Sequence, residues 1–184
     1  NRGFFLRNGG YFFDINDYFK LQVTGDIYSK GGAALYLNST YRVRYKYGGN
    51  FNFSYTNNPA STNVENVSYV KDFRLTWNHS PQSKGSSRFS ASVNAATSSF
   101  NNNNFLGVNT NPATPRIDNT TRKLSSNVAY SKTFGSQFSL GINLRHNQDV
   151  STGQVDLPMP DVSFNINNIY PFKKVIEGMF FENF

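Results

Sequence analysis

The clearest pattern in the chain is an alternation of apolar and polar residues over residues 33–47, AALYLNSTYRVRYKY. One set of alternate positions, which includes Leu35, Leu37 and Val43, is mainly apolar or aromatic, whereas the other set is mainly polar and carries three cations. Successive side chains of a strand point to opposite faces of the sheet, so the segment predicts a strand with one apolar and one polar face. The segment is longer than an ordinary soluble strand, which has about five or six residues. Its length suits a strand that crosses a bilayer, which needs roughly 9–11 residues.

The same period recurs along the chain and predicts about nine consecutive strands. The other expected strands cover residues 4–16, 19–28, 51–56, 72–78, 89–95, 124–134 and 138–147, with a last strand that starts near Val155. Gly and Asn tolerate the backbone conformations of short hairpins, so turns are expected at 29–32, 48–50 and 135–137. In the last strand the apolar positions change register, which predicts a bulge near Pro160.

These elements predict an all-β fold, namely an antiparallel up-and-down segment of a transmembrane β-barrel. Loops at 57–68 and 100–121 are longer than the other connections. In outer-membrane barrels, long loops face outward and short turns face the periplasm. An odd number of strands does not close a bacterial single-chain barrel in the usual way, so a larger wall is expected. Residues 1–172 would form the barrel-wall segment, and residues 173–184, which show no clear alternation, a separate tail.

Composition agrees with a wall that separates lipid from water. Aromatic residues make up 16% of the chain, but the hydrophobic share is only 38%, below the roughly 45–50% usual for globular domains with glycine included. No apolar run approaches 18 residues, which excludes a transmembrane helix. A soluble β-sandwich would alternate in the same way. The long strands, and aromatic residues such as Tyr47 and Trp77 near strand ends, favour the membrane.

The chain has a formal net charge of +7, which suggests an anionic partner. Seven cations on polar positions would project into a barrel lumen and are candidate contacts for an anionic amphiphile: Lys20, Arg42, Arg44, Lys46, Arg74, Arg88 and Arg145. Alternatively, they line a hydrated lumen and pair with acids such as Asp26 and Asp72. Nucleic acid is not expected, because cations and acids are mixed on the strand faces and no recognition motif is present.

Catalytic chemistry has little support in the sequence. His79 and His146 are the two histidines, each lies at the end of an expected strand, and neither belongs to a cluster with metal-ligand spacing. The chain has no cysteine, phosphate-binding loop, nucleophile elbow or paired carboxylates. We therefore expect a protein that is not an enzyme and that holds neither a metal nor a cofactor.

Several blocks together resemble one family. They are GGYFFDINDYFKLQVTGDIYSKGG, YRVRYKYGGNFNFSY, FRLTWNHSP, SRFSASVNAATSSFNNNNF and FNINNIYPF, and they span residues 3–172. Their order and spacing resemble the start of the barrel domain of LptD (OstA), the outer-membrane family that inserts lipopolysaccharide into the outer leaflet. The most telling pair is WNHS and the following F-x-A-x-V-N-x-x-T-S-S-F strand.

The resemblance implies a bacterial outer-membrane location and a barrel of about 26 strands. It also implies four partners, which are lipopolysaccharide, an LptE-like plug lipoprotein, the periplasmic Lpt bridge reached through an N-terminal domain missing from this chain, and outer-membrane lipid. In the family, prolines weaken strand pairing at a lateral gate, and one of them would fall at Gly10, which makes Gly9 and Gly10 a candidate gate-proximal strand. The alternatives are a segment of another large barrel, such as a porin or TonB-dependent transporter, and a soluble glycan-binding β-sandwich.

Overall fold

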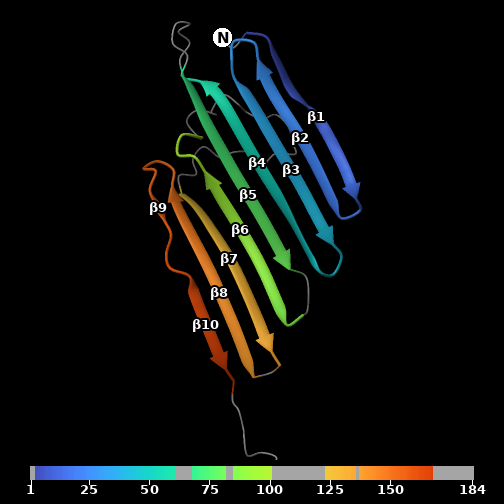
Figure 1. Cartoon of the computed structure of the whole chain (residues 1–184), viewed down its shortest axis with the longest axis vertical. Coiled ribbons are helices and arrows are strands. Elements are labelled where there is room, and N and C mark those ends of the chain that lie inside the picture. Colours follow the sequence, from blue (N-terminus) through green and yellow to red (C-terminus); the bar gives the residue numbers. More distant parts are fainter. Residues whose placement is uncertain (1–2, 61–67, 82–84, 101–122, 136, 168–184) are drawn as a thin grey trace, which may run out of the picture.

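The computed structural model describes residues 3–60, 68–81, 85–100, 123–135 and 137–167. They form one antiparallel sheet in a single layer (Figure 1). Its ten strands are β1 (Phe5–Asn16), β2 (Phe19–Tyr28), β3 (Ala33–Val43), β4 (Tyr47–Pro59), β5 (Tyr69–Pro81), β6 (Ser87–Ala96), β7 (Lys123–Phe134), β8 (Phe138–Asp149), β9 (Val155–Asp156) and β10 (Asp161–Ile166).

The strand order confirms the predicted meander. Each strand from β1 to β8 pairs with the next one along the chain, and β10 then pairs with β8. The sheet is not closed, so β1 and β10 are its two edges. The expected tail, 173–184, and nearly all of the long loop at 100–121 lie outside the described residues.

The last expected strand is broken into β9 and β10. Both strands pair with β8, and residues 157–160 between them belong to neither. Pro158 and Pro160 lie in this gap, and proline has no N–H to donate to a neighbouring strand. The expected bulge near Pro160 is therefore a longer interruption of the strand.

The predicted turn at 48–50 is wrong. β3 ends at Val43, residues 44–46 make the turn, and Tyr47 pairs with Val43. Tyr45 takes the positive φ of 62° that this turn needs. Residues 48–50 instead lie inside β4.

Gly49 is needed inside β4 because other atoms occupy the place of a side chain. It pairs with Tyr41 across the sheet. A Cβ atom at Gly49 would lie 2.4 Å from the Tyr41 hydroxyl oxygen and 2.3 Å from the Asn78 carbonyl oxygen. Glycine is thus needed at this position because neighbouring groups approach closely, and not because the chain turns there. In the sequence the two roles look alike, since glycine is common in turns.

The first strand pair contains a bulge. Leu6 pairs with Ile27 and Gly9 pairs with Gly25, so β1 has one extra residue in this interval. Asn8 adopts a φ of 55° in the bulge, and its N–H donates to an Asp26 carboxylate oxygen at 2.8 Å. Gly10 then lies so close to β2 that a Cβ atom would be 2.0 Å from the carbonyl oxygen of Val23. Bulges of this kind bend a strand and are frequent at sheet edges.

The pairing register confirms the two predicted faces. One row across β1–β6 is apolar or aromatic and consists of Tyr11, Val23, Leu37, Phe53, Leu75 and Ala95. The adjacent row on the opposite face of β2–β6 consists of Gln22, Asn38, Asn52, Thr76 and Asn94. Residues opposite each other in a pair share a face, so the sheet has one apolar and one polar face.

Within the described part of the chain, no second layer covers the apolar face (Figure 1). Leu35 is 40% exposed, and Leu37 and Val43 are only half-buried. A small cluster of buried apolar side chains lies at the end of β6–β8 and is made of Ala96, Phe100, Leu124 and Val150. The polar face, in contrast, buries several hydrophilic side chains, among them Thr24, Asp26, Thr56 and Asp72.

Candidate functional site

The polar face is the candidate site, and the register decides which predicted cations lie on it. Five do: Lys20, Arg42, Arg74, Arg88 and Arg145, which are opposite Thr40, Gly48, Ser54, Ser131 and Asn127. The other two, Arg44 and Lys46, belong to the turn between β3 and β4. The earlier end of β3 thus moves these two cations from a strand face to a turn.

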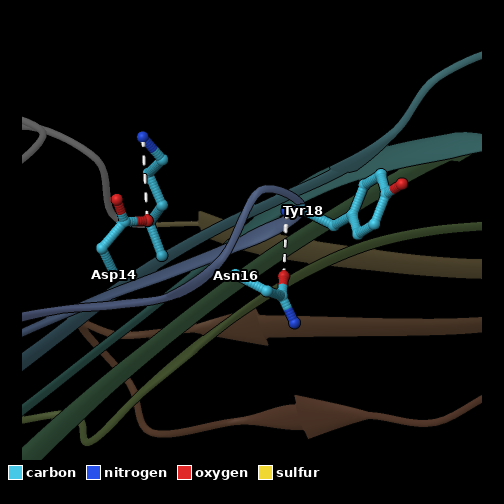
Figure 2. Close-up of polar contacts among 4 residues, drawn as sticks. Asp14, Asn16 and Tyr18 are labelled. Atoms are coloured by element: carbon cyan, nitrogen blue, oxygen red, sulfur yellow. Dashed lines mark hydrogen bonds and ion pairs between the residues drawn. The ribbon is translucent and has the colours of Figure 1, made fainter.

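Two of the five cations form ion pairs with acids of a neighbouring strand. Lys20 Nζ lies 3.9 Å from Asp14 Oδ1, and Figure 2 shows this pair beside the turn in which the N–H of Tyr18 donates to the side-chain oxygen of Asn16. Arg145 pairs with Asp161. All four side chains are at least half exposed, so water screens both pairs and each is worth at most about 1 kcal/mol.

The other three cations, Arg42, Arg74 and Arg88, form no ion pair with any described residue. Arg42 and Arg88 are exposed and lie near the short turns. Arg74 is half-buried in the middle of the sheet, where its direct neighbours are Ser54 and Ala96. These guanidinium groups can therefore donate hydrogen bonds to an external anion.

The acids expected to neutralise these cations bind other groups. Asp72 is fully buried and its Oδ1 accepts hydrogen bonds from the hydroxyls of Thr97, at 2.9 Å, and Ser99. Asp26 accepts a hydrogen bond from the β1 bulge. Asp72 thus fixes the chain that follows β6, and Asp26 fixes the edge strand.

Amides and hydroxyls fill the space between the charges. Asn52 Nδ2 donates to Thr76 Oγ1 at 3.2 Å, and Ser92 Oγ donates to Asn78 Oδ1 at 3.2 Å. Four buried polar atoms on this face have no hydrogen-bond partner in the described protein: Asn38 Nδ2, Thr56 Oγ1, Asn94 Oδ1 and Asn143 Oδ1. Buried polar atoms normally have a partner, so this face suits contact with water or a polar ligand.

Sequence reasoning missed an interruption of the backbone pairing between β6 and β7, where side chains bridge the two strands. Regular pairing ends at Ser92 and Asn127. Beyond it, Ser126 Oγ accepts from the N–H of Asn94 and also contacts its carbonyl oxygen, at 2.9 and 3.1 Å. Gln148 of β8 binds the N–H and carbonyl of Ala96 in the same manner, at 3.4 and 2.6 Å. Side chains here replace backbone partners, which period-two patterning cannot reveal.

The two histidines do not form a metal site with other described residues, where no group of three His, Cys, Asp or Glu side chains could hold an ion. His146 Nδ1 lies 3.4 Å from Ser126 Oγ. His79 Nδ1 lies 2.8 Å from the Tyr41 hydroxyl on the apolar face, which also accepts a hydrogen bond from Trp77. The sequence shows His79 as an isolated residue at a strand end, and the contact with Tyr41 needs the correct β3–β4 register.

The described chain has no helix long and apolar enough to span a membrane.

Comparison with known proteins gives one match. No curated protein matches the chain, and no solved structure does. A family model described as LptD protein matches residues 1–184, the full length of the chain. The chain therefore belongs to the LptD family, as its resemblance in sequence predicted.

Proposed function

We propose that this chain is part of an outer-membrane β-barrel translocon that exports lipopolysaccharide and inserts it into the outer leaflet. Membership of the LptD family supports lipopolysaccharide transport in the bacterial outer membrane. The two-faced, single-layer sheet supports a barrel wall. No bond is made or broken in this function, because the wall guides an anionic amphiphile past a hydrophobic barrier.

In this proposal the apolar face contacts lipid. Its side chains are exposed along the strands, as Leu35, Phe73 and Leu144 are. Exposed apolar surface of this extent is unfavourable in water and favourable in hydrocarbon. A soluble glycan-binding sandwich would need a second sheet over this face, and the described residues contain one sheet.

The polar face then lines a hydrated lumen, and the observation that carries the proposal is its set of cations that form no ion pair with a described residue. Arg42, Arg74 and Arg88 can bind the phosphates of lipopolysaccharide, since a guanidinium matches phosphate with two parallel hydrogen bonds. The buried amide and hydroxyl atoms beside them can bind water or sugar hydroxyls. Arg44 and Lys46 lie in a turn at the end of the sheet, so they do not belong to this set of lumen contacts.

The wall would continue beyond this sheet. Both edge strands, β1 and β10, are exposed along their entire length and carry large apolar side chains. Long apolar edges readily pair with further strands. The bulge and the glycines Gly9 and Gly10 make β1 a candidate gate-proximal strand, and the LptE-like plug and periplasmic Lpt bridge are the partners proposed for the complete barrel.

Photocrosslinking in cells tests this function. A photoreactive residue in place of Asn52, at the centre of the polar face, should crosslink to lipopolysaccharide in the assembled full-length protein. Replacing Arg42, Arg74 and Arg88 together by Gln should lower the yield several-fold, because the phosphates lose charge-assisted hydrogen bonds. The matched control is Lys20→Gln with Arg145→Gln, which removes cations that already have acidic partners.

Three outcomes have distinct meanings. A larger loss in the triple variant than in the control supports a cationic route for lipopolysaccharide. Equal crosslinking yields in the two variants would show that the three arginines are ordinary hydrated residues of the lumen and do not bind lipopolysaccharide. An assembled protein that never crosslinks to lipopolysaccharide from Asn52 would contradict the export function and favour another large barrel, such as a porin or a TonB-dependent transporter.

A further inference from the structure

An aromatic cluster on the apolar face surrounds His79 near the short turns. It consists of Tyr41, Tyr47, Trp77, His79 and Phe89, which come from β3, β4, β5 and β6. The imidazole centroid lies 5.7 Å from the Tyr41 ring, 5.5 Å from Tyr47, 6.2 Å from Trp77 and 5.4 Å from Phe89. Figure 1 shows these strands side by side, with the β3–β4 turn at one end of the sheet.

Hydrogen bonds fix the orientation of this cluster. Trp77 Nε1 donates to the Tyr41 hydroxyl at 2.9 Å, and the same hydroxyl lies 2.8 Å from His79 Nδ1. Gly49 leaves room for the Tyr41 ring, because a side chain there would overlap it. Among the described residues, none hydrogen-bonds to His79 Nε2. The ring therefore has one nitrogen held by the protein and one available to an external group.

The end of the sheet beside the cluster is cationic. The described residues 41–47, 77–81, 85–89, 130–135 and 137–138 contain no Asp or Glu, but they contain five cations: Arg42, Arg44, Lys46, Arg88 and Lys132. Arg44 and Lys46 lie in the turn that leads directly into Tyr47. Lys132 is on the apolar face, where it lies over the ring of Phe134, 4.9 Å from the centroid. The turn cations, the ring surface and an imidazole nitrogen with no described partner thus lie at the same end of the sheet.

We propose that the aromatic cluster and the turn cations Arg44 and Lys46 bind the phosphate of an anionic phospholipid, such as phosphatidylglycerol, in the leaflet at the short-turn end. This inference rests on the proposed function, in which the apolar face contacts lipid. Tyr and Trp rings prefer the head-group level of a bilayer, where both hydrocarbon and water are in reach. His79 Nε2 and the turn cations would donate to the phosphate oxygens, and each cation adds roughly a fivefold preference for an anionic surface.

Quenching of Trp77 fluorescence by brominated lipid tests the proposal. Trp77 is the one tryptophan in this chain. Subtracting the signal of a Trp77→Phe variant isolates its emission in the full-length protein, reconstituted in mixed phosphatidylcholine and phosphatidylglycerol bilayers. Two samples are compared: in one the phosphatidylcholine is brominated and in the other the phosphatidylglycerol, with the brominated lipid at the same mole fraction in both. We expect brominated phosphatidylglycerol to quench Trp77 several-fold more than random mixing allows.

The variants separate head-group binding from general basicity. Arg44→Gln with Lys46→Gln should bring the two brominated lipids to nearly equal quenching, and His79→Phe, which keeps an aromatic ring, should lower the preference in part. Lys30→Gln removes a cation from the turn between β2 and β3, at the other end of the sheet, and should leave the preference intact.

Equal quenching of the native protein by both lipids would overturn the head-group site but leave the lipid-facing wall in place. Absence of quenching by either lipid would instead contradict the proposed function. Inorganic phosphate, added against chloride of matched ionic strength, should not change the preference. If it abolished the preference, the site would recognise free phosphate and the assignment to a lipid would be wrong.

Discussion

Replacing Leu37 by arginine tests which face of β3 meets hydrocarbon. Leu37 lies at mid-strand on the apolar face, directly opposite Val23 and Phe53, whereas Asn38 lies on the polar face. An arginine on the lipid face near the bilayer midplane costs about 2–4 kcal/mol. The ratio of folded to unfolded protein should thus fall roughly 30-fold to several hundredfold for Leu37→Arg, at a factor of ten per about 1.4 kcal/mol. Asn38→Arg adds the same charge on the polar face, outside hydrocarbon, and should cost much less.

The assay is the urea midpoint of the full-length barrel in lipid vesicles, together with the amount of assembled protein in cells. Leu37→Ala is the control for lost side-chain volume, because it shortens the residue without adding charge. It should fall between the native protein and Leu37→Arg. If Leu37→Arg and Asn38→Arg destabilised the barrel equally, the assignment of faces would be refuted.

Two further substitutions test local packing. Gly49→Ala should destabilise the barrel by about 1–3 kcal/mol, because its Cβ would overlap Tyr41 and a backbone oxygen; Gly48→Ala, where the nearest atom is 3.6 Å away, should cost less in the same urea titration, and the reverse order would contradict the β3–β4 register. Asp72→Ala should cost about 1–3 kcal/mol, since the hydroxyls of Thr97 and Ser99 lose their acceptor. Asp72→Asn retains an oxygen acceptor and should recover part of this loss, whereas equal effects would show that the hydrogen bonds are not what holds this chain segment.

Much of the fold could be predicted because the alternation is a local property. β2 has the predicted bounds, Phe19–Tyr28, and Gly31 and Gly32 take the positive φ angles of the turn that follows it. In both cases the residues themselves carry the information, as side-chain polarity in the strand and as backbone freedom in the turn.

The β3–β4 hairpin could not be predicted in this way, because Gly49, which looks like part of a turn in the sequence, instead leaves room for neighbouring groups. The register that places Tyr41 over Gly49 depends on two strands at once. A sequence read one strand at a time cannot distinguish a glycine that permits a turn from one that permits a neighbouring ring to approach.

The sequence could predict which face of the sheet the cations of the candidate site occupy, but it could not predict which of them form ion pairs. Alternation placed Arg74 and Arg145 on the polar face, as the structure does. Which cation meets an acid depends on distances between strands, and Arg145 has Asp161 for a partner whereas Arg74 has none among the described residues. The central role of His79 in the aromatic cluster likewise requires four strands in register.

The central claim is that alternate side chains of one strand face lipid and water, and spin labelling along β3 tests it most directly. The chain has no native cysteine, so single cysteines at successive positions from 33 to 43 can each carry a label in the assembled barrel. Collision rates with oxygen, which concentrates in lipid, should peak at Leu35 and Leu37, and rates with a water-soluble nickel complex should peak at the positions between them. A flat profile, or oxygen maxima on the polar positions, would contradict the account.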